Sequence, residues 1–219
     1  MSAAYPAEAP LDCPLCPRLV AFREATARDH PDWHNAPVES FGDPQARLLV
    51  VGLAPGLRGA NRTGRPFTGD WAGDLLYATL GKFGFTRGTY DSRPDDGLTL
   101  VDAMITTAVR CVPPENKPVG AEASACRPFL TARIAALPRL EAILCLGKIS
   151  HDNTLRALGH KMKDATFGHG ARARLDGPNG PLQLFDSYHC SRYNPNIGRL
   201  TEAMFDSVFA DIRAYLDAG

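Results

Sequence analysis

The sequence predicts an α/β fold in which helices cover both faces of a parallel sheet. Short apolar runs that end in glycine or proline are typical of buried strands, and they alternate with segments whose apolar residues recur at helical spacing. No repeat, low-complexity tract or linker divides the 219 residues, a length that fits one core. We therefore expect a disordered lead over residues 1–10 and a single domain over residues 11–219.

The expected elements follow in chain order. A helix over 17–28 comes directly after a Cys-x-x-Cys motif, and the run Arg-Leu-Leu-Val-Val-Gly-Leu at 47–53 predicts a buried strand. Helical spacing predicts a helix over 69–83, N-capped near Thr68 or Asp70. The remaining elements are a strand or strand pair over 98–109, a helix over 121–137, a strand over 140–146, a helix over 148–158, a loop or hairpin over 159–180, a strand over 181–188 and an amphipathic helix over 200–216.

Charge and hydropathy narrow the class of protein. The 24 basic residues balance 24 acidic ones, which gives no global support for a nucleic-acid partner. Six basic residues against two acidic ones gather over 147–175, as either a solvated face or a binding surface. No apolar run approaches the roughly 20 residues that span a bilayer, and the N-terminus lacks the regions of a signal peptide. We therefore expect a cytoplasmic protein with reduced thiols and no membrane partner.

Three unusual loops each follow a predicted strand, over 52–70, 110–119 and 188–199. In an open parallel sheet, ligands gather at the carboxyl ends of the strands. These loops therefore predict a site on one rim of the sheet.

The cysteines predict a soft metal centre. Thiolates suit zinc or an iron–sulfur cluster. Because fourteen residues separate the second pair, compact zinc spacing is absent, whereas clusters tolerate irregular spacing. Cys145 lies in an apolar strand and is expected in the core, whereas the rim-loop residue Cys190 is either free or functional. The alternative is that the four candidate ligands are unrelated small core residues; they are Cys13, Cys16, Cys111 and Cys126.

The first rim loop combines glycines with groups that suit a polar, planar ligand. The stretch Gly52-Leu-Ala-Pro-Gly56 lets backbone amides approach a ligand, but it matches neither a Walker loop nor a dinucleotide fingerprint. Phe67 either stacks on a planar ring or fills the core. Asp70 is either a helix cap or a chemical group. Side chains suited to phosphates or base edges are Asn61, Arg62 and Arg65.

The other two rim loops add further candidates. Asn116, in a loop stiffened by prolines, either reads a base or holds a water, or belongs to an ordinary turn. His189 leaves a strand onto the rim, where it can donate a hydrogen bond to a developing anion. Arg192 and Tyr193 can wedge into a base stack. The other five histidines are assigned surface or structural roles.

Together these segments resemble the uracil-DNA glycosylase superfamily, and within it the type-b (family 5) enzymes. The resemblance runs from Cys13 to the closing helix. It is carried by Gly52-Leu-Ala-Pro-Gly56, Asn61-Arg-Thr-Gly-Arg-Pro-Phe-Thr-Gly-Asp70, Cys111-Val-Pro-Pro-Glu-Asn-Lys-Pro118, His189-Cys-Ser-Arg-Tyr-Asn194 and Gly198-Arg-Leu-Thr201.

The resemblance implies a three-layer α/β/α sandwich around a four-stranded parallel sheet and a [4Fe–4S] cluster held by the four candidate cysteines. It implies hydrolysis of the N-glycosidic bond of a damaged base flipped out of double- or single-stranded DNA, leaving an abasic site, by a monomer. Phe67 then stacks on the base and His189 faces its carbonyl. The expected pocket and DNA contacts also include Gly52, Ala54, Gly56, Asn61, Arg62, Arg65, Ser191, Arg192 and Tyr193.

Departures from the family pattern refine these expectations. The first motif is apolar at Leu53 and Ala54 and lacks the carboxylate or asparagine of other relatives, an absence that type-b enzymes share, so Asp70 and Asn116 become the candidates for positioning water. Thr107 stands where type-a relatives place an asparagine, which favours hypoxanthine and xanthine as substrates beside uracil. Cys190 replaces a proline beside His189. The alternatives are a non-catalytic iron–sulfur protein that binds nucleic acid or transfers electrons, and a zinc-stabilised module for a planar ligand.

Overall fold

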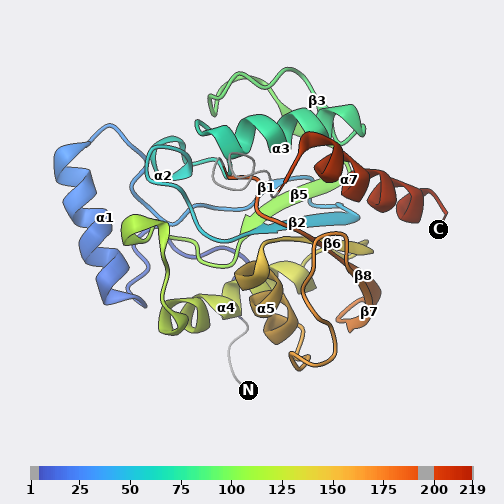
Figure 1. The fold of residues 1–219 in the computed structure, drawn as a ribbon. Helices are drawn as coiled ribbons and strands as arrows, with labels where there is room; N and C mark the ends of the chain where they lie inside the picture. The colour runs from blue at the N-terminus through green and yellow to red at the C-terminus, as the bar shows by residue number, and fades with distance from the viewer. Residues whose placement is uncertain (1–4, 192–199, 219) are drawn as a thin grey trace.

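A computed structural model describes residues 5–191 and 200–218, which form three layers (Figure 1). Helices α3 (Trp71–Lys82) and α7 (Glu202–Asp217) cover one face of the central sheet. Helices α4 (Gly120–Ala135) and α5 (Lys148–Ala157) cover the other. The expected α/β/α fold is confirmed. The expectations for Arg192 and Tyr193 lie outside the described residues.

The central sheet has six strands, not the four that were expected. Its order is β1-β5-β2-β6-β8-β7. The inner four strands are mutually parallel: β5 (Ala103–Thr107), β2 (Leu48–Gly52), β6 (Ala142–Leu146) and β8 (Gly180–Ser187). The added edges β1 (Phe41–Gly42) and β7 (Arg172–Gly177) are antiparallel. A two-residue strand has too few positions to show periodicity, and β7 forms a hairpin with β8 within the stretch expected as a loop or hairpin.

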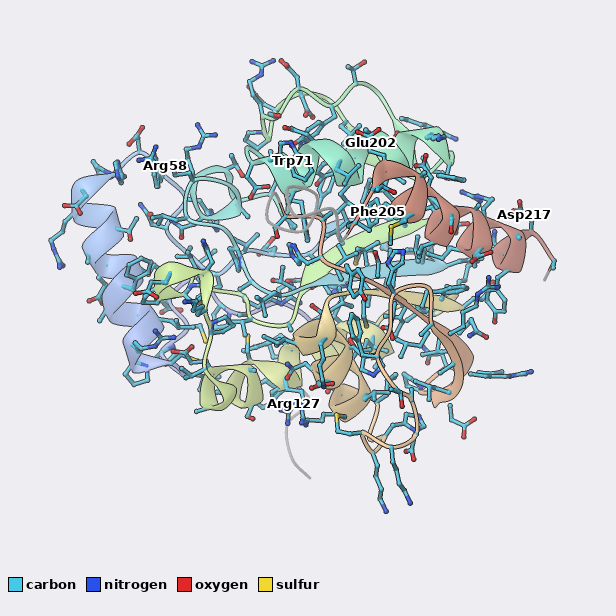
Figure 2. The ribbon with its side chains drawn as sticks, in the orientation of Figure 1. Arg58, Trp71, Arg127, Glu202, Phe205 and Asp217 are labelled. Atoms are coloured by element: carbon cyan, nitrogen blue, oxygen red, sulfur yellow. The ribbon has the colours of Figure 1, made fainter. Side chains whose placement is uncertain are left out.

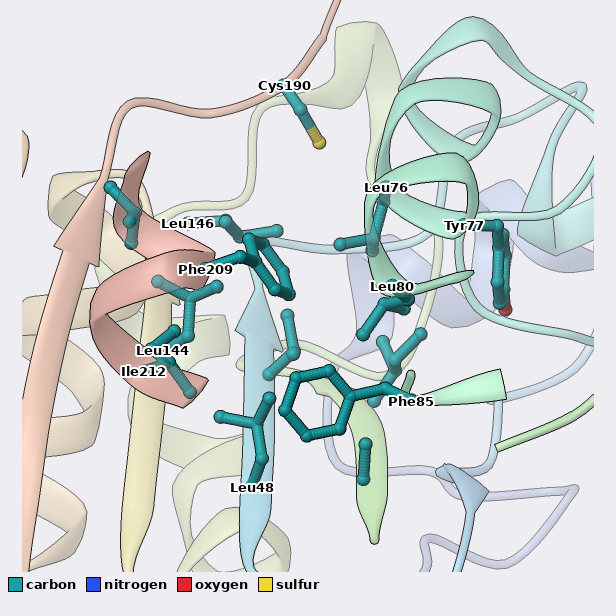
Figure 3. Packing of buried hydrophobic residues seen from close by; sticks show 14 of the residues in the cluster. Leu48, Leu76, Tyr77, Leu80, Phe85, Leu144, Leu146, Cys190, Phe209 and Ile212 are labelled. Atoms are coloured by element: carbon teal, nitrogen blue, oxygen red, sulfur yellow. The ribbon is translucent and has the colours of Figure 1, made fainter. Parts of the chain in front are cut away.

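The inner strands are apolar throughout because both of their faces are covered. Leu48 and Val50 of β2 pack under α3 and α7, while Leu49 and Val51 pack against the α4 and α5 layer. Figure 3 shows the first of these layers, in which Phe85 and Phe209 fill the space between the helices and the sheet.

The smaller elements lie outside the two main layers. Helix α1 (Pro17–Asp29) follows the Cys-x-x-Cys motif and packs through Leu19 on Val109, in the segment after β5. A short helix α2 (Ala60–Thr63) and a 3-10 turn η1 (Pro114–Asn116) lie in the rim loops. Strands β3 (Thr86–Arg87) and β4 (Thr99–Leu100) form a separate two-stranded sheet. Among the described residues, no helix combines the length and apolar character needed to cross a membrane.

The described part of the expected disordered lead is packed against the fold. Ala9 is buried beside Cys13, and Tyr5 makes an edge contact with the Phe129 ring. The Glu8 carboxylate accepts hydrogen bonds from Arg133 and from the backbone N–H of Ser40. The Glu8 side chain therefore holds residues 5–10 in place through partners far along the chain. Such contacts leave no periodic pattern in the sequence.

Candidate active site

One cavity of about 560 Å³ opens at the carboxyl ends of the parallel strands, and we call it the rim cavity. Segments after β2, β5, β6 and β8 all contribute to its wall, as expected for a parallel sheet. The structure brings seven predicted site residues to this cavity: Ala54, Gly56, Phe67, Asp70, Asn116, His189 and Ser191.

Phe67 forms an inner wall of the rim cavity. Its ring faces that of His189, with centroids 5.9 Å apart and an interplanar angle of 26°. Gly52 lies behind the ring, where a Cβ atom would come within 2.7 Å of it. Gly52 therefore acts by making room for Phe67 and does not itself line the cavity. The backbone of Phe67 has a φ of 52°, a left-handed conformation that is unusual for an aromatic residue.

Asp70 is both a helix cap and a cavity residue. Its Oδ1 accepts a hydrogen bond from the Gly73 N–H at 3.1 Å, which makes it the N-cap of α3. Its Oδ2 lies so close to Gly59 that a Cβ there would approach within 2.3 Å. Burial raises the pKa of Asp70, although backbone N–H groups at the helix start oppose the effect.

His189 is neutral at pH 7 because burial lowers its pKa to about 4. The backbone N–H of Ser191 donates to its Nδ1 at 3.0 Å. A neutral imidazole carries one proton, so accepting at Nδ1 places that proton on Nε2. His189 therefore lines the rim cavity as a neutral imidazole with its proton on Nε2.

Asn116 and Thr107 complete the polar wall. Asn116 is exposed, and its left-handed backbone (φ 57°) ends the turn η1. The Thr107 hydroxyl donates to the Val109 carbonyl at 2.9 Å, so its proton is used in a hydrogen bond within its own loop.

The other predicted polar residues of the first loop lie outside the rim cavity. Asn61 is fully buried and donates to the Asn35 side chain at 3.0 Å. Arg65 is buried and pairs with Asp96. Arg62 is exposed, and its Nε donates to the carbonyl of Arg58, which is labelled in Figure 2 beside α2.

The residues at the rim cavity that were not predicted include Lys148, Ile149 and Ser150. They begin α5, directly after β6. Ligands gather at the carboxyl ends of parallel strands, and the same rule applied to the strand expected over 140–146 predicts this fourth loop. Trp71 also lines the cavity, at the start of α3 (Figure 2), although the sequence assigned it only to the helix pattern. Of the histidines given structural or surface roles, His151 is buried and pairs with Asp186 at 2.8 Å.

The four candidate cysteines line a second cavity, which we call the cysteine cavity. All six cysteines of the chain, each within the described residues, have free thiols. The Arg110 backbone N–H donates to Cys126 Sγ at 3.2 Å, and Arg23 Nη1 lies 3.6 Å from Cys111 Sγ. Cys145 and Cys190 are buried in the two core layers, as expected for Cys145.

Burial raises the pKa of three of the four candidate cysteines, Cys16, Cys111 and Cys126. It raises the pKa of Cys111 to about 11 and that of Cys126 to about 12. The enclosure therefore favours thiols unless a metal centre replaces their protons. Within the described residues, no group of three or more His, Cys, Asp or Glu is arranged to hold one metal ion, and this finding includes the four candidate cysteines.

Comparisons with known proteins agree on one family. The family model described as the uracil DNA glycosylase superfamily matches residues 39–213. The chain is 42% identical over 207 residues to a type-5 uracil-DNA glycosylase of Thermus thermophilus, covering 92% of each protein. It is 41% identical to a type-5 enzyme of Mycobacterium leprae (92% of this chain, 90% of that protein) and 37% identical to one of Pyrobaculum aerophilum (95% and 90%).

Proposed function

This chain belongs to the uracil-DNA glycosylase superfamily, and on that premise we propose that it is a DNA-repair glycosylase. It would hydrolyse the N-glycosidic bond of uracil and of deaminated purines such as hypoxanthine and xanthine, leaving an abasic site. One observation supports this most directly: a stacking ring, a carboxylate and a neutral N–H donor, from Phe67, Asp70 and His189, surround one rim cavity.

The rim cavity suits a base turned out of the helix. Flipping costs a few kcal/mol, and least at a mispaired base, which favours deaminated bases. The Phe67 ring offers a face for stacking. Because the Thr107 hydroxyl is bound to its own loop, it is not directed to reading a pyrimidine edge, which supports a broader range of bases.

His189 would stabilise the departing base. Negative charge grows on the base as the glycosidic bond breaks, and the Nε2–H of the neutral ring can donate to it. Donors of this kind are worth roughly 3–4 kcal/mol in oxyanion sites. A neutral donor also leaves the proton on the protein, so the base departs as a hydrogen-bonded anion.

Asp70 would orient the water that attacks the sugar, with Asn116 from the facing loop. The oxocarbenium-like sugar carries positive charge, which the carboxylate also favours. Fixing Asp70 as the N-cap of α3 holds this group in place before the substrate arrives. Little proton abstraction is required early in the reaction, because bond breaking precedes attack.

The cysteine cavity supports a [4Fe–4S] cluster as the cofactor. Four free thiols line it from two distant segments, and N–H donors already reach two of the sulfurs. When bound, the cluster would serve as a structural staple between the segment before α1 and the 111–126 segment. Cys13, Cys16, Cys111 and Cys126 would each supply one thiolate.

Single-turnover cleavage tests the proposed function. Purified protein is incubated with duplexes that each carry one uracil, hypoxanthine or xanthine, and alkaline strand scission then reports abasic sites. We expect wild-type cleavage, and losses of about 10²–10³ in rate for His189→Ala with a large loss for Asp70→Ala. Wild-type rates in both variants would refute these roles, and DNA binding without base release would favour a non-catalytic protein.

A further inference from the structure

A buried polar cluster lies directly behind the wall that Phe67 forms. Arg65 donates through Nη1 and Nη2 to the two carboxylate oxygens of Asp96, each at 2.7 Å. Its Nε donates to the Thr68 hydroxyl, also at 2.7 Å. The side chains of the pair are only 5% and 1% exposed. All three donor nitrogens of this guanidinium are therefore engaged inside the protein.

Aromatic rings enclose the same guanidinium. Its central carbon lies 5.1 Å from the centroid of Phe41, 5.4 Å from Tyr77 and 5.7 Å from Tyr90. The two tyrosine rings stack on each other with centroids 4.4 Å apart. The planar guanidinium suits both contacts at once, since it forms a bidentate bond in its plane and attracts ring faces.

The tyrosines of this cluster also hold the backbone on either side of the Phe67 α-carbon. The Tyr77 hydroxyl donates to the Pro66 carbonyl at 2.8 Å, and the Tyr90 hydroxyl donates to the Phe67 carbonyl at 3.3 Å. The Thr68 hydroxyl that binds Arg65 lies 3.2 Å from the Pro66 carbonyl as well. The cluster thus grips the peptide groups that set the φ and ψ angles of Phe67.

Phe67 needs such a grip because its conformation is disfavoured. A bulky residue at a φ of 52° persists only where the surroundings over-determine it. Gly73 of α3 also lies so close that a Cβ there would come within 1.7 Å of the Phe67 carbonyl oxygen. Without the cluster, the chain can relax toward ordinary angles and carry the ring away from the rim cavity.

We propose that Arg65 is a positioning residue of the rim cavity. With Asp96, Tyr77 and Tyr90 it forms a unit, the Arg65 clamp, which holds Phe67 in its left-handed conformation and so places the ring on which the base stacks. This inference rests on the proposed function, which identifies the ligand that stacks on Phe67 as a base. It replaces the expectation of a DNA contact at Arg65, because the guanidinium is buried and fully occupied.

The main test replaces the ion pair by apolar residues of similar size, as Arg65→Met with Asp96→Leu. A buried ion pair exchanged in this way often leaves stability intact, whereas removing one partner alone strands a charge. Because Asp96 also accepts from the backbone N–H groups of Asp91 and Leu98, we expect the double variant to melt somewhat below the wild-type temperature. Its single-turnover rate at a temperature where it is fully folded should fall on the order of 10²-fold. Its affinity for a duplex with an abasic site should stay unchanged, because that product has no base to stack on Phe67.

A double-mutant cycle with Phe67→Ala distinguishes a loss of Phe67 positioning from general damage to the rim cavity. If the clamp acts through Phe67, adding Phe67→Ala to the Arg65→Met/Asp96→Leu variant slows it little further. Multiplicative losses would overturn the proposal, as would a double variant with the wild-type rate. The matched control is Arg47→Met, which breaks a pair with Asp102 (2.9 Å) at the amino ends of the strands and should leave the rate unchanged.

Hydrogen exchange without DNA tests the clamp even if no base is ever released. The backbone amides of residues 67–73 should exchange faster in the double variant, while those of β2 stay protected. Unchanged exchange over 67–73 would overturn the clamp. Absence of cleavage by the wild-type protein would instead refute the proposed function. Should the double variant fail to fold, Tyr90→Phe removes only the hydroxyl bound to the Phe67 carbonyl, and the same exchange readout applies with a smaller expected change.

Discussion

The rim cavity and the cysteine cavity are both assembled from segments far apart in the sequence, but they differ in backbone strain. The wall of the rim cavity includes two non-glycine residues with left-handed backbones, Phe67 and Asn116. None of the four cysteines has a positive φ. Strain of this kind persists where the surrounding structure enforces it, and it gathers at functional sites. The comparison indicates that backbone strain is concentrated at the rim cavity, where side chains must be held in position.

The largest expected effect concerns the cysteine cavity. If the proposed cluster is present, Cys126→Ala should lose nearly all bound iron and sulfide and lower the melting temperature, because one proposed ligand would be lost and the cluster with it. Cys145→Ala is the matched control, since that buried sulfur lies in β6, away from the cysteine cavity, and should leave the iron content unchanged. Iron and sulfide analysis of anaerobically purified protein measures both, and equal iron content in the two variants would contradict the assignment.

At the rim cavity, Gly52→Ala should affect rate more than stability. The new Cβ would meet the Phe67 ring at 2.7 Å and push it toward the base. A displacement near 1 Å in a catalytic site can cost about 10² in rate. Single-turnover cleavage and melting temperature measure the two effects. Gly120→Ala, which meets nothing within 4 Å at the start of α4, is the control and should cleave normally.

Acid should weaken the fold through His189. Its folded-state pKa of about 4 lies below the unfolded value near 6.5, so the unfolded chain binds more protons between these pH values. Its contribution to the free energy of unfolding is therefore fully present above about pH 6.5 and is lost as pH falls to about 4, by on the order of 2–3 kcal/mol. Urea unfolding of the wild type and of His189→Gln at pH 4 to 7 measures this contribution. If the free energies of unfolding of the two proteins change in parallel with pH, the prediction is contradicted.

The smallest expected effect separates two neighbouring arginines. Exposed Arg62 is expected to touch a phosphate, so Arg62→Ala should weaken DNA binding modestly and reduce the slope of log affinity against log salt by about 1. The clamp variant Arg65→Met/Asp96→Leu should leave that slope unchanged. Titrations of an abasic-site duplex over a range of salt measure both slopes, and a reduced slope for the clamp variant would return Arg65 to the DNA contacts.

Local patterns predicted much of the fold. The apolar runs at β2 and β6 and the helical spacing of α3 were sufficient, because both faces of the inner strands are buried. The rim cavity followed from one rule about strand ends. The edge strands were harder to predict, since β1 has only two residues, and one of them is Gly42, at which a Cβ would meet the Ala103 carbonyl at 2.4 Å.

The Arg65 clamp was beyond sequence reasoning for a different reason. An arginine in a glycine-rich rim loop has the same appearance whether it faces a phosphate or the interior. Its partner Asp96 is 31 positions away in a stretch without regular periodicity. Only the folded chain shows that these charges neutralise each other behind Phe67.

Arg110 extends the cysteine cavity to the beginning of the chain. This residue is 1% exposed and directly precedes Cys111. Its guanidinium pairs with the Glu8 carboxylate at 3.0 Å and donates a hydrogen bond to the Ala7 carbonyl at 3.0 Å. A shortened protein that begins after residue 10 would leave this cation in the interior without its anion, next to the sulfurs. The opening residues therefore belong to the part of the molecule that surrounds the cysteine cavity, and removing them would perturb that part as a substitution does.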